Sequence, residues 1–324
     1  MKAVPQELRD LILNHDFFII AGHKQPDGDC VGSCLALASY LERKGKKAVL
    51  LSAGPFKRVE IRQFETFFSD SIAGTSVPDS AVSLILDCSD LQRTGDAGIG
   101  LEAYPQAVID HHATNGSSGP ADFVDSSVPA TTLLVLALIE SCGDTPNLVE
   151  AEHLLFGMCT DTGFFRHLDA SSAETFQAVS RLVTCGANPK KTFARMNGGK
   201  SFGSRILISR ILSRMQRFYN GQLVISWENL EETEEFGMEG RDSDSLYQLI
   251  QSISGVEAIV IVRQETPTNC TVGFRSLDRI DVSIVASRFG GGGHRQASGL
   301  SIPGTIEELI PRFVEAFQDQ FSGS

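Results

Sequence analysis

Short apolar runs that end directly on an acid or a histidine are the most constraining feature of this 324-residue chain. The first half holds three of them: residues 17–22 before His23, 82–86 before Asp87, and 107–109 before Asp110. Apolar runs of this length predict buried strands. Segments with helical spacing alternate with them, at 31–44, 129–142 and 149–159. This alternation predicts an α/β fold, with a mostly parallel sheet flanked by helices.

The polar residues that follow these runs are of the types that bind hard metal ions. In an open α/β sheet, ligands bind beyond the carboxyl ends of the strands, so the three segments should meet at one edge. Further residues of the same types stand nearby in sequence or after a helical run: Asp27, Asp29, His111, His112 and Asp161. Carboxylate and imidazole ligands suit ions such as Mn²⁺. A pair of ions about 3.5–4 Å apart is a common device for hydrolysing phosphate esters.

Each of these motifs alone also fits a plainer interpretation. The acids of His23-x-x-x-Asp27-x-Asp29 could be turn and helix-capping residues, and Asp87 could be a simple strand-end cap. The pair His111-His112, directly after an acid, has little structural purpose and is the more specific signal. The convergence of several segments on one sheet edge favours the metal site over the separate structural roles.

Composition narrows the possible partners. The net charge of −12 argues against a long surface for duplex nucleic acid, which needs many Lys and Arg. A small anionic substrate remains compatible, because bound divalent ions would cancel much of the charge of clustered acids. No apolar run approaches the ~18 residues of a membrane span, and no basic stretch leads into an apolar segment at the start. We therefore expect a cytoplasmic protein that does not associate with a membrane.

The seven cysteines are odd in number and form no C-x-x-C pair. A disulfide framework or a zinc knuckle is not expected from such a pattern. Cys30 and Cys88 stand beside proposed ligands, but those ligands are hard, so we expect both thiols to be buried and to take no part in the chemistry.

The second half of the chain reads as a separate, smaller α/β unit. Strands are expected at 222–227, 258–263 and 270–274, and helices at 243–253, 282–288 and 306–321. The predicted domains are 1–186, a basic and partly helical linker 187–217, and 218–324. The linker is either a solvated helix face or the lining of an anion-binding cleft. The acidic stretch 228–235 is expected to be a solvated loop.

With these motifs in order, the chain resembles the DHH superfamily of phosphoesterases, and its tail resembles the DHHA1 domain that often accompanies it. The motifs that carry the resemblance are 23–33, 84–90, 108–115, 157–164, 272–276 and 290–299. The pattern most resembles the short bacterial nanoRNase and pAp-phosphatase group. Proteins of that group degrade oligoribonucleotides of a few units and dephosphorylate 3′-phosphoadenosine 5′-phosphate (pAp), and some relatives hydrolyse linear or cyclic di-adenylate.

The resemblance implies a role for each site residue. One ion would take His23, Asp27 and Asp87, and a second would take Asp29, Asp87, His111 and Asp161. Asp110 would orient a histidine, and His112 would face the scissile phosphate as a catalytic group. A substrate-binding set would come from the second domain: Arg275, Ser276, Gly291, Gly292, Gly293, His294 and Arg295. The glycines would let backbone N–H groups approach an anion closely. The active site would lie in the cleft between the two domains.

The resemblance also implies an activity and its alternatives. The expected function is Mn²⁺-dependent hydrolysis of short oligoribonucleotides to mononucleotides and of pAp to AMP, with Mg²⁺ or Co²⁺ as alternative ions. The partners would be short single-stranded RNA, dinucleotides or pAp, and a homodimer is expected from the family. A soluble phosphodiesterase for cyclic di-AMP or pApA has the same motifs. A non-hydrolytic nucleotide sensor is the alternative from another class, although no proposed ligand is missing.

Overall fold

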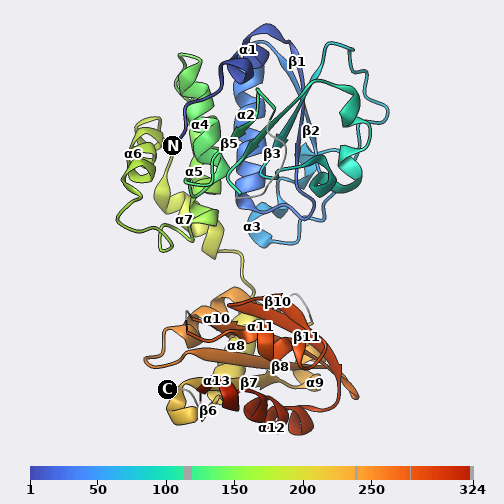
Figure 1. Ribbon diagram of the computed structural model, residues 1–324, viewed down its shortest axis with the longest axis vertical. Coiled ribbons are helices and arrows are strands. Elements are labelled where there is room, and N and C mark those ends of the chain that lie inside the picture. The colour runs from blue at the N-terminus through green and yellow to red at the C-terminus, as the bar shows by residue number, and fades with distance from the viewer. Residues whose placement is uncertain (113–118, 238–239, 278, 322–324) are drawn as a thin grey trace. The chain divides into compact units, whose positions relative to one another are not determined.

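A computed structural model describes residues 1–112, 119–237, 240–277 and 279–321, which form two compact units, Met1–Gly199 and Lys200–Ser324 (Figure 1). The division falls within the stretch 187–217 that the sequence marks as a linker. Residues 113–115 of the third motif, and the last three residues of the predicted second domain, lie outside the described ranges.

The first unit contains a five-stranded sheet of order β2-β1-β3-β4-β5 in which all neighbours are parallel. Its strands are β1 Phe17–Gly22, β2 Lys47–Leu51, β3 Val82–Leu86, β4 Gln106–Asp110 and β5 Phe123–Val124. The central strands β1 and β3 are buried on both faces and, apart from Ser83, carry no polar side chain, as expected for a parallel sheet. The predicted α/β class with a mostly parallel sheet is therefore confirmed.

Helices cover one face of this sheet and short 3₁₀ segments cover the other. The helices are α1 Gln6–Asn14, α2 Gly28–Arg43, α3 Val59–Arg62, α4 Thr131–Ser141, α5 Leu148–Asp161, α6 Ala173–Thr184 and α7 Pro189–Asn197. The main core joins α2, α4 and α5 to the sheet (Figure 1). The opposite face packs against the 3₁₀ segments Leu91–Gly98 and Leu101–Ala103. None of the helices in the described parts of the chain combines the length and the apolar character needed to cross a membrane.

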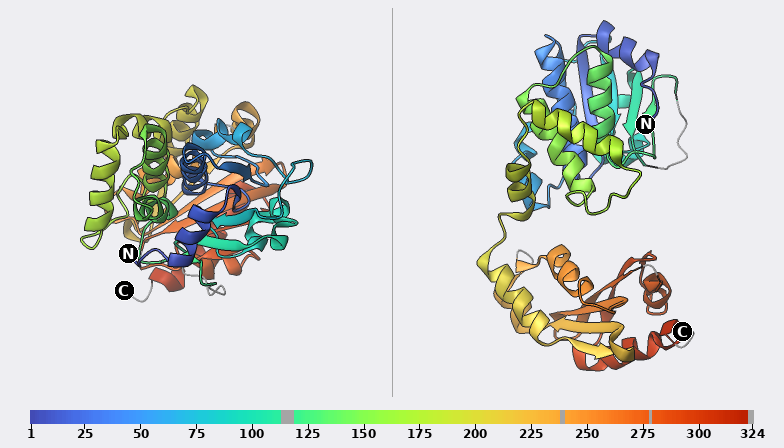
Figure 2. Two further views of the ribbon diagram at one scale, coloured as in Figure 1. Left: turned by 90° about the horizontal axis from the view of Figure 1, so that it is seen from above. Right: turned by 90° about the vertical axis from the view of Figure 1, so that its left-hand side faces the viewer.

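The second unit is built on a mixed sheet of order β10-β11-β9-β8-β7-β6, in which β7 and β8 are parallel and the other neighbours antiparallel. The strands are β6 Gln216–Phe218, β7 Leu223–Glu228, β8 Ala258–Thr266, β9 Asn269–Ser276, β10 Gly292–His294 and β11 Ala297–Pro303. The helices are α8 Phe202–Ser213, α9 Leu230–Phe236, α10 Ser243–Gln251, α11 Val282–Ser287, α12 Ile306–Ala316 and α13 Gln318–Phe321. Helices α8 and α12 lie on opposite sides of this sheet (Figure 2).

The acidic stretch 228–235 is not the solvated loop that its composition predicts. Glu228 is fully buried at the end of β7, and α9 begins almost at once with a capping box. The Glu228 carboxylate accepts hydrogen bonds from Arg241 and Arg263 at 2.9–3.2 Å. These arginines come from distant segments, so the neutralisation of this acid could not be recognised from its local sequence.

The basic residues of 187–217 are largely partnered inside their own units. The guanidinium of Arg195 lies 5.4 Å from the ring centres of both Phe64 and Phe156. Three further arginines form ion pairs: Arg205 with Asp242, Arg210 with Glu235, and Arg214 with Glu232. This arrangement ties α7 to the first unit and α8 to the second.

Candidate metal centre

The carboxyl edge of the parallel sheet gathers the predicted ligands. His23 follows β1, Asp87 follows β3, and Asp110 ends β4. The hydrogen bonds between β3 and β4 continue one residue past the end of β3, because the backbone N–H of Asp87 donates to the Ile109 carbonyl at 3.0 Å. Asp87 then turns into the left-handed region with φ of 60°, a conformation that Asp tolerates better than most residues and that often occurs at functional sites. This turn directs the buried Asp87 carboxylate towards the histidines on both sides.

Helices α2 and α5 bring Asp29 and Asp161 to the same edge. They run antiparallel and very close together, because glycines on both helices face the partner. A Cβ on Gly32 would lie 2.7 Å from the His153 carbonyl, and one on Gly157 would lie 3.1 Å from the Asp29 Cα. This approach sets the last residue of α5, Asp161, beside the first turn of α2.

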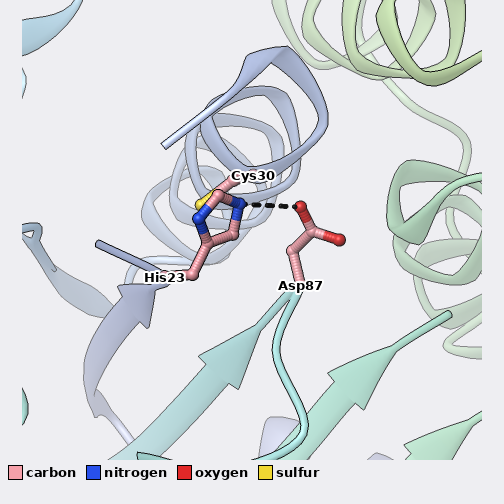
Figure 3. A group of neighbouring side chains, drawn as sticks. All are labelled: His23, Cys30 and Asp87. Carbon is pink, nitrogen blue, oxygen red and sulfur yellow. Dashed lines mark ion pairs between the residues drawn. The ribbon is translucent and has the colours of Figure 1, made fainter. Parts of the chain in front are cut away.

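One group of donors surrounds His23. Its Nε2 lies 3.5 Å from Asp87 Oδ2 (Figure 3). The same nitrogen lies 3.8 Å from Asp27 Oδ1. Asp27 also caps α2, since its Oδ1 accepts from the backbone N–H groups of Asp29 and Cys30 at 3.1 Å. The cap positions the carboxylate against the imidazole.

A second group surrounds His111. Its Nε2 lies 3.3 Å from Asp161 Oδ2, 3.6 Å from Asp87 Oδ1 and 4.0 Å from Asp29 Oδ2. Asp87 thus presents one oxygen to each histidine. Both sets of predicted ligands therefore lie at this edge, on either side of Asp87. The donor atoms that lie within 4.8 Å of one another form three groups: His23, Cys30 and Asp87; Asp87, His111 and His112; and Asp29, His111 and Asp161.

Asp110 and His112 form a pair at the rim of the site. His112 Nδ1 donates to the fully buried Asp110 carboxylate at 2.7 Å, and the backbone N–H of His112 donates to the same oxygen at 3.1 Å. This contact holds the imidazole in one tautomer and leaves Nε2 on the other side of the ring. The side chain of His112 is 38% exposed and can meet a substrate.

Two buried threonines at the start of α4 belong to the site although the sequence interpretation missed them. Thr131 Oγ1 donates to Asp87 Oδ1 at 2.9 Å. Asp29 accepts from the backbone N–H groups of Thr131 and Thr132 and from Thr132 Oγ1, at 2.5, 3.0 and 2.7 Å. The N-terminus of α4 therefore orients two of the acids. A Thr-Thr pair opening a helix that is apolar over residues 133–139 was the available signal.

Without a cation, the clustered acids oppose one another. Burial and the charges of Asp87 and Asp161 raise the pKa of Asp29 well above its ordinary value. Burial, together with Asp27 and Asp161, also raises the pKa of Asp87, although His23 opposes the shift. A divalent cation beside them would favour the ionised form of both carboxylates.

The same acids raise the pKa values of the histidines that they surround. Burial lowers the pKa of His23, but Asp27 and Asp87 outweigh it and leave the pKa far above the ordinary value. Burial similarly opposes the shift at His111, but Asp161 and the other surrounding acids raise the pKa of His111 to about 9. Burial raises the pKa of Asp27, but His23 lowers it to about 2.

The donor set fits divalent metal ions. His111 Nε2 is buried and, among the described residues, has no hydrogen-bond partner of normal geometry although acids surround it. A nitrogen held in this way, among hard carboxylate oxygens, is placed as a metal ligand would be. Protons on the histidines would be displaced when an ion binds.

Proton and metal binding should therefore compete in a defined pH window. In the metal-free protein, the pKa of His111 is about 9 when folded, against an ordinary 6.5. The proton stabilises the folded state fully below pH 6.5, and this stabilisation disappears as the pH rises to about 9. We expect the free energy of unfolding of chelator-treated protein to fall across this window, while the affinity for Mn²⁺ rises. Urea unfolding and metal titration at a series of pH values measure both.

The matched controls are two His→Gln variants. H111Q should weaken the pH dependence of unfolding, because the titrating group is gone. H15Q, altered at the carboxyl end of α1, should retain it. A free energy of unfolding that stays constant or rises between pH 6.5 and 9 in the metal-free protein would contradict this electrostatic account.

The predicted substrate-binding residues of the second unit also converge. Across neighbouring strands, Arg275 of β9 is paired with Ala297 of β11, which is paired with His294 of β10. His294 and the following Arg295 are exposed, whereas the Arg275 guanidinium stacks 4.7 Å from the Tyr247 ring centre.

The remaining predicted residues of the second unit shape the backbone. Ser276 is buried and its hydroxyl donates to the Ile280 carbonyl at 2.7 Å, so it shapes the loop and does not face solvent. A Cβ on Gly291 would lie 2.6 Å from the Leu300 Cβ, and one on Gly293 2.5 Å from the Ala297 carbonyl. Both positions therefore need glycine, while Gly292 between them is exposed with open space around it.

A parallel sheet whose carboxyl edge holds this set of acids and histidines defines a metal-dependent hydrolase. Residues 17–158 match the DHH family, N-terminal domain, and residues 220–323 match the DHHA1 domain. The chain therefore belongs to the DHH family of phosphoesterases, with a DHHA1 domain after the DHH domain.

Known relatives extend over most of the chain. The bifunctional oligoribonuclease and PAP phosphatase NrnA of Thermus thermophilus is 29% identical over 304 residues, which cover 94% of this chain and 90% of that protein. The cyclic-di-AMP phosphodiesterase PdeA of Listeria monocytogenes is 24% identical, over 99% of this chain but 50% of that protein. The fold also matches an exopolyphosphatase-related protein from Bacteroides fragilis, with a TM-score of 0.77, 22% identity and 99% of each chain covered.

Proposed function

We propose that this protein is a Mn²⁺-dependent phosphoesterase that hydrolyses short oligoribonucleotides to mononucleotides and pAp to AMP. The observation that carries the proposal is Asp87, whose two oxygens face His23 and His111 at 3.5 and 3.6 Å. A carboxylate in this position can bridge two ions, and the Thermus relative with the oligoribonuclease and PAP phosphatase name is similar over almost the whole of both chains.

The ligands would be divided between two ions as the resemblance to the DHH superfamily implies. One ion would be held by His23, Asp27 and Asp87, and the other by Asp29, Asp87, His111 and Asp161. When bound, such ions lower the pKa of a water molecule towards neutrality and neutralise charge on the phosphate.

The chain's own residues carry the remaining steps. Thr131 keeps the Asp87 carboxylate in place, and Asp110 keeps His112 oriented. His112, when protonated on both nitrogens, would then deliver its Nε2 proton to the leaving 3′-oxygen as a general acid, while Asp110 accepts from Nδ1 and holds the ring in position. Arg275, His294 and Arg295 of the second unit would bind the substrate's other phosphate or its base, which orients the scissile bond.

The second candidate function is hydrolysis of cyclic di-AMP or pApA. The Listeria cyclic-di-AMP phosphodiesterase is similar over 99% of this chain, although the chain spans only half of that protein. Hydrolysis of cyclic di-AMP or pApA would use the same metal ligands, so the two functions differ only in the substrate that the second unit accepts.

The test is release of mononucleotide or phosphate from four substrates: pAp, pApA, cyclic di-AMP and a 5′-phosphorylated RNA trimer. Each is incubated with Mn²⁺ and, separately, with a chelator. We expect Mn²⁺-dependent cleavage of the trimer, pApA and pAp. Preferred cleavage of cyclic di-AMP would support the second function. Tight nucleotide binding without any turnover would make the protein a sensor and refute both.

The second unit can be tested through His294. H294A should raise KM for the RNA trimer about tenfold with little change in kcat, which is the effect of losing one hydrogen bond to a charged group. The residue is exposed on the edge strand β10, so folding should not suffer. T268A, at the exposed turn between β8 and β9, is the matched control and should leave KM unchanged. Equal KM values for H294A and the wild type would remove His294 from the substrate site.

A further inference from the structure

The thiol of Cys30 lies inside the metal centre. Cys30 is in the first turn of α2, is only 2% exposed, and faces the imidazole of His23 (Figure 3). One ligand atom from each of His23, Cys30 and Asp87 lies within 4.8 Å of the other two. The sequence alone suggested that this thiol takes no part, because its neighbours are hard ligands.

The position of the thiol is fixed by close packing. A Cβ on Gly22, the last residue of β1, would lie only 2.1 Å from the Cys30 Sγ. Glycine at the strand end therefore makes the space in which the sulfur sits beneath His23. This packing holds Cys30 next to the donor group of the first ion position.

The spacing of the donors suits a shared ion. Nitrogen, oxygen and sulfur ligands at about 2.0–2.3 Å from one ion lie about 3.3–3.8 Å apart when the angle between them is tetrahedral. His23 and Asp87 are 3.5 Å apart, and His23 and Asp27 are 3.8 Å apart. With the thiol, His23 and Asp87 form a set of three donors within 4.8 Å of one another, and Asp27 reaches this set through His23, at 3.8 Å.

We propose that Cys30 is a fourth ligand at the metal position of His23, Asp27 and Asp87, and that it shifts the preference of this position towards softer ions such as Zn²⁺ and Co²⁺. The proposal rests on the metal binding that the proposed function requires. Thiolate sulfur binds these ions more strongly than Mn²⁺, whereas the oxygen-rich position of Asp29 and Asp161 has no such bias. The ion would displace the thiol proton as it binds.

The test is the absorption spectrum of the full chain, freed of metal with a chelator and titrated with Co²⁺. A thiolate–Co²⁺ bond gives an intense charge-transfer band in the near ultraviolet that imidazole and carboxylate ligands do not give. We expect this band in the wild-type protein and in C34A, and its loss in C30A. Cys34 is the matched control because it is buried one turn further along the same helix.

A competition titration provides a second measure. C30A should lose at least about tenfold in affinity for Zn²⁺, which is the lower limit for removing a group that supports a metal site. The affinity for Mn²⁺ should change much less, so the ratio of the two affinities reports the role of the sulfur. Thermal unfolding of the metal-free variants establishes that both are folded.

The outcomes separate this inference from the proposed function. Stoichiometric Co²⁺ binding without the band, or a band that persists in C30A, overturns the role of Cys30 alone, and Mn²⁺-dependent turnover would still stand. Failure of the wild-type protein to bind Co²⁺, Zn²⁺ or Mn²⁺ overturns the inference together with the proposed function.

Discussion

Asp87→Asn is expected to reduce Mn²⁺-dependent turnover of the RNA trimer at least about a thousandfold, or about 4 kcal/mol of transition-state stabilisation. Asp87 faces both histidines, so its charge serves both proposed ion positions. Asparagine removes the negative charge and little else, because it tolerates the positive φ of this position and can still accept the hydrogen bond from Thr131. Steady-state kinetics with saturating Mn²⁺ measure the loss.

Thermal stability shows whether D87N acts through metal binding. Mn²⁺ should raise the unfolding temperature of the wild-type protein, because it binds the folded state. D87N should lose most of this increase, while its metal-free form should be at least as stable as the wild type, since one of the mutually repelling buried acids is gone. The control is D96N, which removes an exposed charge from the 3₁₀ segment after β3 and should behave as the wild type. Ordinary turnover in folded D87N would refute the two-ion assignment.

Gly157→Ala is expected to reduce turnover about a hundredfold by displacing Asp29, which is the scale of loss for a misplacement of about 1 Å. The added Cβ would lie 2.5 Å from the Thr132 Cγ2 and 3.1 Å from Asp29 Oδ1. Thr132 holds Asp29 through two hydrogen bonds, so the methyl group would disturb the ligand through its support. Forcing helices α2 and α5 apart should also cost about 1–3 kcal/mol of stability.

The control for G157A is the same substitution at Gly203, near the start of α8 in the second unit. There the nearest atom to an added Cβ belongs to the ring of the half-buried Phe236, at 3.1 Å. G203A should retain both turnover and stability. Urea unfolding and the Mn²⁺ affinity of each variant separate a loss of stability from a displaced ligand. Wild-type turnover and Mn²⁺ affinity in G157A would mean that the α2–α5 contact does not position Asp29.

The sequence was most informative where a ligand directly follows a strand. His23, Asp87 and Asp110 could be placed at one edge because parallel strands all point their carboxyl ends the same way. Asp27 and Asp29 follow His23 within one short loop, so they could be placed with it. Local order along the chain and the direction of the strands were sufficient for these residues.

The sequence was least informative where a residue acquires its role from a distant partner. Thr131 and Thr132 become part of the site because α4 begins against Asp29 and Asp87. Glu228 is buried because Arg241 and Arg263 neutralise it. None of these partners is adjacent in the chain, so no local pattern indicates them.

The sequence by itself thus determined the α/β class, the order of the motifs and the residue types of the metal centre. These depend on apolar periodicity and on which residues end each strand, which are properties of short segments. Only the tertiary structure decided that Asp87 faces two histidines, that α4 orients the acids, and that the Cys30 thiol lies beneath His23. Those features depend on how closely the helices pack against the sheet and against one another. Gly22, at the end of β1, and Gly157, on α5, permit these close contacts by having no side chain.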